Sequence, residues 1–250
     1  MRVLAIGAHP DDIELGCGGA LLVHRRAGHQ LAMLVMTGGE RGPRGMTSRR
    51  TEQEEVARAL GAELRWGGFT DGAVDGGHHG VAVVEAAIAA ARADVIYTHG
   101  LADTHQDHRA TAEATFAASR RNARVLCYET PSSIAFAPHV YVDIDGVVEG
   151  KLDLLRMHLS QVLGSGPVDL EAVEAQARFR GHQGRVRHAE GFTTHRLLWE
   201  PGLVGTAVEA RGSAAHDTRR TDGALVGSDG AVLGNAVERA LDTGAPTGDR

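Results

Sequence analysis

The chain has few cysteines, no membrane-length apolar run and no excess of basic residues. Cys17 and Cys127 are its only cysteines, too few for a disulfide framework or a cysteine-based zinc site. No apolar segment approaches the length of a transmembrane helix. The net charge of −6 argues against a nucleic-acid-binding surface. An apolar strand is expected from about residue 2, which leaves no room for a signal peptide. We therefore expect a cytoplasmic protein that binds neither nucleic acid nor membrane.

Short apolar runs alternate with segments of helical periodicity over most of the 250 residues. Strands are expected near 2–8, 31–36, 63–66, 94–98, 124–128, 141–144 and 193–199. Helices are expected near 12–27, 49–60, 81–93, 147–162 and 170–180, and another follows residues 103–108 and runs to about 119. Continuous apolar strands that alternate with helices are typical of a parallel sheet covered on both faces. The sequence therefore predicts an α/β fold of the Rossmann-like, doubly wound type, with a mainly parallel sheet.

The composition changes after residue 200. Residues 1–200 are expected to form one domain, because this length suits a single large core. Residues 201–250 are rich in glycine, alanine and aspartate and contain few aromatic residues. We expect this tail to be weakly ordered, with one short helix near 231–241.

Two clusters of polar residues follow predicted strands. His9, Asp11 and Asp12 come after the first apolar run, and residues 103–108, Asp-Thr-His-Gln-Asp-His, come after another. A Pro-Asp-Asp sequence is also a common helix start, so the first cluster alone has a purely structural interpretation. Ligands of open α/β sheets bind at the carboxyl ends of the strands, where both clusters are expected. Together they predict a metal site.

The residue types indicate hydrolytic chemistry. A catalytic zinc ion takes three protein ligands and keeps one position for water. His9 and Asp12, three residues apart around a turn, can converge on one ion, and a histidine from the second cluster completes the set. A spare carboxylate can take a proton from water, and a second imidazole can donate to an oxyanion. The inventory predicts metal-assisted attack of water on an acyl or phosphoryl centre.

Two motifs resemble those of a known family. Ala8–Asp12 followed by Glu14–Gly19, and later His105–His108, resemble the signatures of the LmbE-like, or PIG-L, family of zinc-dependent N-deacetylases. Further short matches extend the resemblance to about residue 199; they are Arg49 with Glu52, Asp71 with Gly72, and the segments 158–161 and 189–192. The resemblance implies a hydrolase of linear amide bonds. Its substrate would be an N-acetylglucosamine-type amino sugar, and its products acetate and a free amine.

The resemblance also assigns roles to residues. It implies that His9, Asp12 and His108 bind Zn²⁺, although Fe²⁺ also suits these ligands. Asp11 would be the general base for a zinc-bound water. His105 would stabilise the oxyanion or protonate the leaving amine. Because relatives often assemble, a homo-oligomer is expected as well.

Further residues are assigned in the same way. Asp107 would tune the histidines of the site, and Arg49 and Asp71 match positions that contact sugar hydroxyls in relatives. In one branch of the family, a catalytic tyrosine stands two residues before the His-x-Asp-His motif. This chain has Asp103 there, which argues against close kinship with that branch.

Other interpretations leave more of the sequence unexplained. Residues 103–108 resemble a metallo-β-lactamase-like motif with Asp103 in place of its first histidine, but that fold is antiparallel and gives His9 and Asp11 no role. Two histidines and one carboxylate also occur in non-haem iron oxygenases. A dinucleotide site conflicts with the carboxylates that follow the first strand. A non-catalytic, metal-containing sugar-binding protein stays open as an alternative.

Overall fold

A computed structural model describes residues 1–42, 48–163 and 167–198 of the chain. Its strands are β1 (Arg2–Gly7), β2 (Gln30–Thr37), β3 (Glu63–Phe69), β4 (Val95–Thr98), β5 (Arg124–Tyr128), β6 (Val140–Asp143) and β7 (Ala189–Leu197). They form one sheet in the order β3-β2-β1-β4-β5-β7-β6. Strands β1 to β5 are parallel, and β7 runs antiparallel to both of its neighbours. The predicted Rossmann-like, mainly parallel sheet is confirmed.

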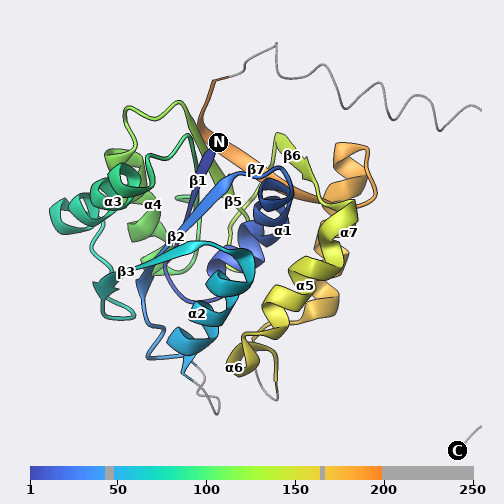
Figure 1. The fold of residues 1–250 in the computed structure, drawn as a ribbon, viewed down its shortest axis with the longest axis horizontal. Helices are drawn as coiled ribbons and strands as arrows, with labels where there is room; N and C mark the ends of the chain where they lie inside the picture. The colour runs from blue at the N-terminus through green and yellow to red at the C-terminus, as the bar shows by residue number, and fades with distance from the viewer. Residues whose placement is uncertain (43–47, 164–166, 199–250) are drawn as a thin grey trace, which may run out of the picture. The chain divides into compact units, whose positions relative to one another are not determined.

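Helices cover both faces of this sheet, as predicted (Figure 1). They are α1 (Asp12–Arg26), α2 (Arg49–Leu60), α3 (His78–Ala91), α4 (Gln106–Ala118), α5 (Val148–Arg156), α6 (Leu159–Val162) and α7 (Leu170–Gly184), with a short 3₁₀ turn, η1 (Asp145–Val147), before α5. Helices α3 and α4 pack together on one side, and α1, α2, α5 and α7 lie on the other (Figure 1). No helix in the described part of the chain is long and apolar enough to cross a membrane.

Strand β1 is buried on both faces because its side chains alternate between two cores. Val3 and Ala5 pack with α1 and α2, whereas Leu4 and Ile6 pack with α3 and α4. This explains why the strand reads as a continuous apolar run rather than an alternating one.

Local signals set the ends of α2 and the approach of α1 to the sheet. Ser48 Oγ accepts a hydrogen bond from the N–H of Thr51, and Gly61 ends α2 with φ of 66°, so the helix has its predicted bounds. In α1, a Cβ on Gly16 would lie 2.1 Å from the ring of Tyr128. Only glycine lets α1 pack this closely against β5.

The structure differs from the sequence prediction near the C-terminal end of the domain. The helix expected over 147–162 is divided between α5 and α6, because His158 leaves the helical conformation (φ −83°, ψ 66°) and turns its ring to Glu14. The strand expected near 193–199 begins at Ala189 and runs antiparallel. The tail at 201–250, its predicted helix and the boundary at 200 lie outside the described residues.

The topology separates the loops that follow β1 and β4. These strands are adjacent, but β1 leads into α1 on one face of the sheet and β4 leads into α4 on the other. The loops that follow the two strands therefore separate at a topological switch point, where α/β sheets bind ligands. Both polar clusters lie on these loops and in the first turns of α1 and α4.

Candidate active site

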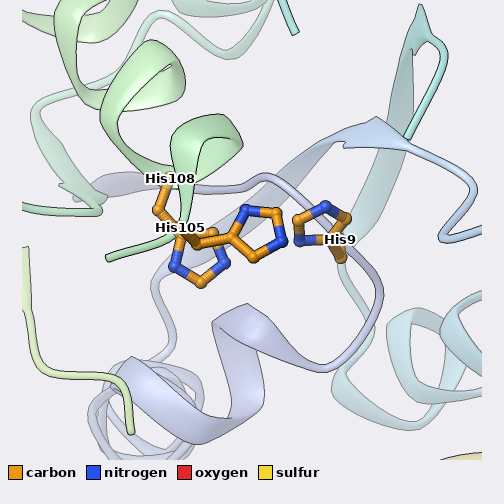
Figure 2. Close-up of side chains that lie close together, drawn as sticks. All are labelled: His9, His105 and His108. Atoms are coloured by element: carbon orange, nitrogen blue, oxygen red, sulfur yellow. The ribbon is translucent and has the colours of Figure 1, made fainter. Parts of the chain in front are cut away.

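The loops after β1 and β4 bring the two polar clusters face to face. The ring centroids of His9 and His105 are 4.7 Å apart, and those of His9 and His108 are 5.4 Å apart. Figure 2 shows the three imidazoles together, with His9 on the loop after β1 and the other two at the start of α4. Residues about 100 positions apart in sequence thus share one site.

Asp12 lies between the two histidines predicted to bind metal. Its Oδ2 is 3.3 Å from His9 Nδ1, and its Oδ1 is 3.3 Å from His108 Nε2. All three side chains are buried. Two imidazole nitrogens and a carboxylate are the donor set of a catalytic zinc site.

The other ring nitrogen of His9 faces a second carboxylate. His9 Nε2 lies 3.1 Å from Asp107 Oδ2, and the same carboxylate accepts the backbone N–H groups of Gly72 and Val74. A proton on Nε2 leaves the Nδ1 lone pair directed at Asp12. A carboxylate behind a histidine ligand is the usual arrangement at protein metal sites. Asp107 therefore contacts the histidine side of the site, through His9.

His108 has the same arrangement with a different partner. Its Nδ1 lies 3.1 Å from Asp103 Oδ2 and 3.1 Å from Ser132 Oγ, while its Nε2 faces Asp12. Asp103, which replaces the tyrosine of one family branch, is buried beneath the imidazole. The sequence showed Asp103 only as a departure from a motif.

A further imidazole, His99, lies next to Asp12 and His108. His99 Nε2 is 3.2 Å from Asp12 Oδ2, and its ring stacks on His108 with centroids 4.0 Å apart. The same Nε2 accepts the N–H of Ala8 at 3.1 Å, so its lone pair is already used. The only sequence signal for His99 is its position at the end of the apolar run that forms β4.

Several combinations of side chains are close enough to hold an ion. Donor atoms lie within 4.8 Å of one another in three sets: His9, His105 and His108; Asp12, His99 and His108; and His9, Asp71 and Asp107. In the last set both carboxylates accept backbone hydrogen bonds, as Asp71 Oδ2 does from Arg41 N–H at 2.9 Å. Asp12 Oδ2 likewise accepts the N–H of His9 at 2.7 Å, so hydrogen bonding does not choose among these sets. The trio of His9, Asp12 and His108 stays the prediction from the sequence, with Asp12 3.3 Å from a ring nitrogen of each histidine.

Asp11 has a strained backbone beside these donors. Its φ is 92°, in the left-handed region that residues other than glycine rarely adopt. Its N–H donates to Gln53 Oε1 at 3.1 Å, and Arg49 donates to Asp11 Oδ1 at 2.9 Å. Burial raises the pKa of Asp11 to about 6, although the Arg49 guanidinium opposes the rise. A carboxylate with this pKa suits a general base near neutral pH.

Gln53 belongs to a buried chain of hydrogen bonds that the sequence analysis did not anticipate. Its Nε2 donates to Glu14 Oε1 at 2.8 Å, and Glu14 Oε2 lies 3.2 Å from His158 Nε2. Gln53 and Glu14 are fully buried. The chain ties the backbone of Asp11 to α1, α2 and the segment before α6. A glutamine one turn into a helix carries no sequence signal for such a role.

The two predicted substrate contacts also lie at the site. Arg49 reaches across to Asp11 and to the carbonyl oxygen of Pro10. Asp71 Oδ1 is 3.3 Å from His9 Nε2. Both side chains thus contact the residues around the donor set.

His105 caps α4 and lies beside the rings of His9 and His108. Its Nδ1 accepts the N–H of Asp107 at 3.2 Å, and its side chain is half-buried. Burial, together with the nearby His108 and His9, lowers the pKa of His105 below its usual value. A neutral ring with Nδ1 as an acceptor carries its proton on Nε2, where it can act as a donor.

Comparison with known proteins identifies the family. Residues 4–119 match the PIG-L family, described as GlcNAc-PI de-N-acetylase. The chain is 36% identical over 177 residues to the Escherichia coli K12 protein named uncharacterized deacetylase YaiS, covering 63% of this chain and 90% of that protein. The chain belongs to the PIG-L (LmbE-like) family. The resemblance in the two motifs is confirmed, and a deacetylase-type hydrolase is supported at the level of the family.

Solved structures agree with this assignment. The conserved protein TT1542 from Thermus thermophilus superposes with a TM-score of 0.73 and 29% identity, covering 80% of this chain and 98% of that one. N,N′-diacetylchitobiose deacetylase from Pyrococcus horikoshii gives 0.68 and 25%, covering 77% and 82%. The hydratase GalB from Pseudomonas putida KT2440 gives 0.69 at 19% identity, covering 80% and 98%, and shows the fold alone. The metallo-β-lactamase-like alternative is not favoured, since this sheet is mainly parallel.

Proposed function

We propose that this PIG-L family protein is a zinc-dependent deacetylase that removes the N-acetyl group from an N-acetylglucosamine-type amino sugar. The observation that carries the proposal is Asp12 between His9 Nδ1 and His108 Nε2, with the buried carboxylate of Asp11 beside it. The likeness to a diacetylchitobiose deacetylase supports the substrate class.

His9, Asp12 and His108 would hold the metal. The carboxylates behind the two imidazoles favour the protonation of the outer nitrogens and leave the inner lone pairs free. Zn²⁺ fits this donor set, and Fe²⁺ accepts the same ligands. A bound divalent ion supplies Lewis acidity, which makes water nucleophilic near neutral pH.

Asp11 would act as the general base. Arg49 and Gln53 hold its side chain and its backbone next to the donor set. With a pKa of about 6, the carboxylate is mostly ionised at pH 7 and accepts the proton of the attacking water. Its left-handed backbone keeps this orientation at a cost of about 1–3 kcal/mol.

His105 would stabilise the developing charge on the acetamide oxygen. The N–H of Asp107 occupies its Nδ1, so the proton on Nε2 is available to the oxyanion and then to the leaving amine. Asp107 thereby acts twice: its backbone orients His105, and its carboxylate orients His9.

Arg49 and Asp71 are proposed to contact sugar hydroxyls. Arg49 Nε is a buried donor without a hydrogen-bond partner among the described residues. Cytoplasmic location and homo-oligomeric assembly stay predictions.

The test is an acetate-release assay on N-acetylglucosamine, N,N′-diacetylchitobiose and N-acetylglucosamine conjugates, with an N-acetyl amino acid as a non-sugar control. The full chain is stripped with a chelator and reloaded with Zn²⁺, or with Fe²⁺ without oxygen. We expect acetate release from the sugars that the chelator abolishes and the metal restores. Sugar binding without acetate release would support the non-catalytic alternative.

A further inference from the structure

Asp103 contacts both His105 and His108, the two histidines of residues 103–108. Its Oδ2 lies 3.1 Å from His108 Nδ1, and its Oδ1 accepts the backbone N–H of His105 at 2.8 Å. The residue is 3% exposed, so its carboxylate exchanges these partners for water only at a large cost. The buried carboxylate of Asp103 therefore contacts the side chain of His108 and the backbone of His105.

Asp103 is itself held by two paired loops. Thr130 Oγ1 donates to Asp103 Oδ2 at 3.0 Å, and Arg109 donates to the Asp103 carbonyl oxygen at 2.6 Å. The N–H of Thr104 donates to Ser132 O at 3.0 Å, and Asp103 forms an isolated antiparallel bridge with Ser133. The segments after β4 and after β5 thus form a short ribbon that fixes the position of the carboxylate.

The carboxylate selects one form of the His108 ring. A carboxylate only accepts hydrogen bonds, so it favours the proton on Nδ1 and leaves the lone pair on Nε2, the atom that faces Asp12. The nearby Ser132 hydroxyl donates as well as accepts, so it does not select a form by itself.

We propose that Asp103 is a positioning residue that directs the lone pair of His108 Nε2 into the metal site and anchors His105 at the start of α4. This inference rests on the proposed metal site. It assigns to Asp103 a supporting role through two histidines.

The main test is Asp103→Asn, measured with the full chain and zinc alone. The amide oxygen can still accept the His105 N–H. Its NH₂ group would then face His108 Nδ1 and favour the ring form with the proton on Nε2, which cannot bind metal. We expect zinc affinity, measured by competition with a chelator, to fall about 10- to 100-fold. The visible spectrum of the Co²⁺-loaded protein should change, with little change in Tm.

Two further variants test separately the contact of Asp103 with the His105 backbone and its contact with Thr130. Asp103→Ala also releases the backbone of His105, so the zinc-loaded variant should release acetate more slowly than zinc-loaded Asp103→Asn. Thr130→Val removes the hydroxyl that holds Asp103 Oδ2 and also contacts Ser132 Oγ and Ser133 Oγ, and it should weaken zinc binding by a few fold. If Asp103→Asn fails to fold, unchanged zinc affinity in Thr130→Val overturns the inference.

A matched aspartate–histidine pair provides the control. Asp145 Oδ1 lies 2.8 Å from His188 Nδ1, on residues that the proposed site does not use. Asp145→Asn should keep the parental zinc affinity. Folded Asp103→Asn that binds zinc within twofold of the parent overturns the inference. A parent that binds zinc but releases no acetate refutes only the proposed function, whereas a parent that binds no zinc refutes both.

Discussion

Histidines gather at both ends of the sheet, but in opposite surroundings. At the carboxyl ends of the strands, burial disfavours the charged rings of His9 and His108, yet the carboxylates of Asp12, Asp107 and Asp103 outweigh it. The pKa of His9 rises to about 10 and that of His108 to about 9.

At the end of α1 far from the site, the balance is reversed. His24 Nδ1 lies 2.8 Å from His29 Nδ1, and its Nε2 lies 2.9 Å from the Tyr97 hydroxyl. Burial, together with the neighbouring His29, lowers the pKa of His24 to about 4. Neighbouring imidazoles alone therefore do not stabilise a positive charge. The buried carboxylates at the site do stabilise a positive charge, and a bound divalent cation would supply one.

The largest effect should come from removing a proposed ligand. His108→Ala should weaken zinc binding by more than about 100-fold, beyond the loss expected for an outer partner, and abolish acetate release. His24→Gln, at the other histidine cluster, should keep a full complement of zinc. Zinc content after dialysis measures both, and equal content in the two variants would refute the contrast between the clusters.

Asp11→Asn should retain zinc but lower kcat by about 10²- to 10⁴-fold, because the proton of the attacking water loses its acceptor. Asp94→Asn is the matched control, since Asp94 also pairs with an arginine, Arg2, at 2.7 Å but lies away from the site. Steady-state acetate release measures the difference. Full activity in Asp11→Asn would show that another group is the base.

Gln53→Met should reduce kcat about 10-fold while leaving zinc content and KM nearly unchanged. The variant keeps the side-chain volume but loses the acceptor for the strained Asp11 N–H, so the base is held less accurately. Gln183→Met, which removes an amide contact with Arg180 on α7, should have parental kcat. Equal kcat in both variants would mean that Asp11 is held without Gln53.

The smallest expected effect concerns the stability of the protein and the pair of His24 and His29. His24 has a pKa of about 4 when folded and about 6.5 when unfolded, so the unfolded chain binds more protons between these values. Its contribution to the free energy of unfolding is complete above pH 6.5 and falls on acidification towards pH 4, by at most about 1.4 kcal/mol per pH unit. Urea unfolding of zinc-loaded protein at about pH 5 and about pH 7 should show a shallower pH dependence in His24→Gln than in the parent. Identical slopes would contradict the effect of burial.

The local structure of this protein was predictable from the sequence alone. Continuous apolar runs predicted the parallel strands, and the helix near 49–60 was predicted with the bounds of α2, because each signal spans a few neighbouring residues. The prediction of a metal site needed both polar clusters. The direction of β7 was not predictable, since alternation cannot tell which way a late strand enters the sheet.

Only the tertiary structure decided the partners around the site. Asp107 pairs with His9 from 98 positions away, and Ser132 reaches His108 from 24 positions away. Gln53 holds Asp11 across 42 positions. Sequence patterns report how each segment folds on its own, whereas these hydrogen bonds depend on how the loops after β1, β4 and β5 pack against one another. Which nitrogen of His9 and of His108 faces Asp12 is therefore a property of the folded chain.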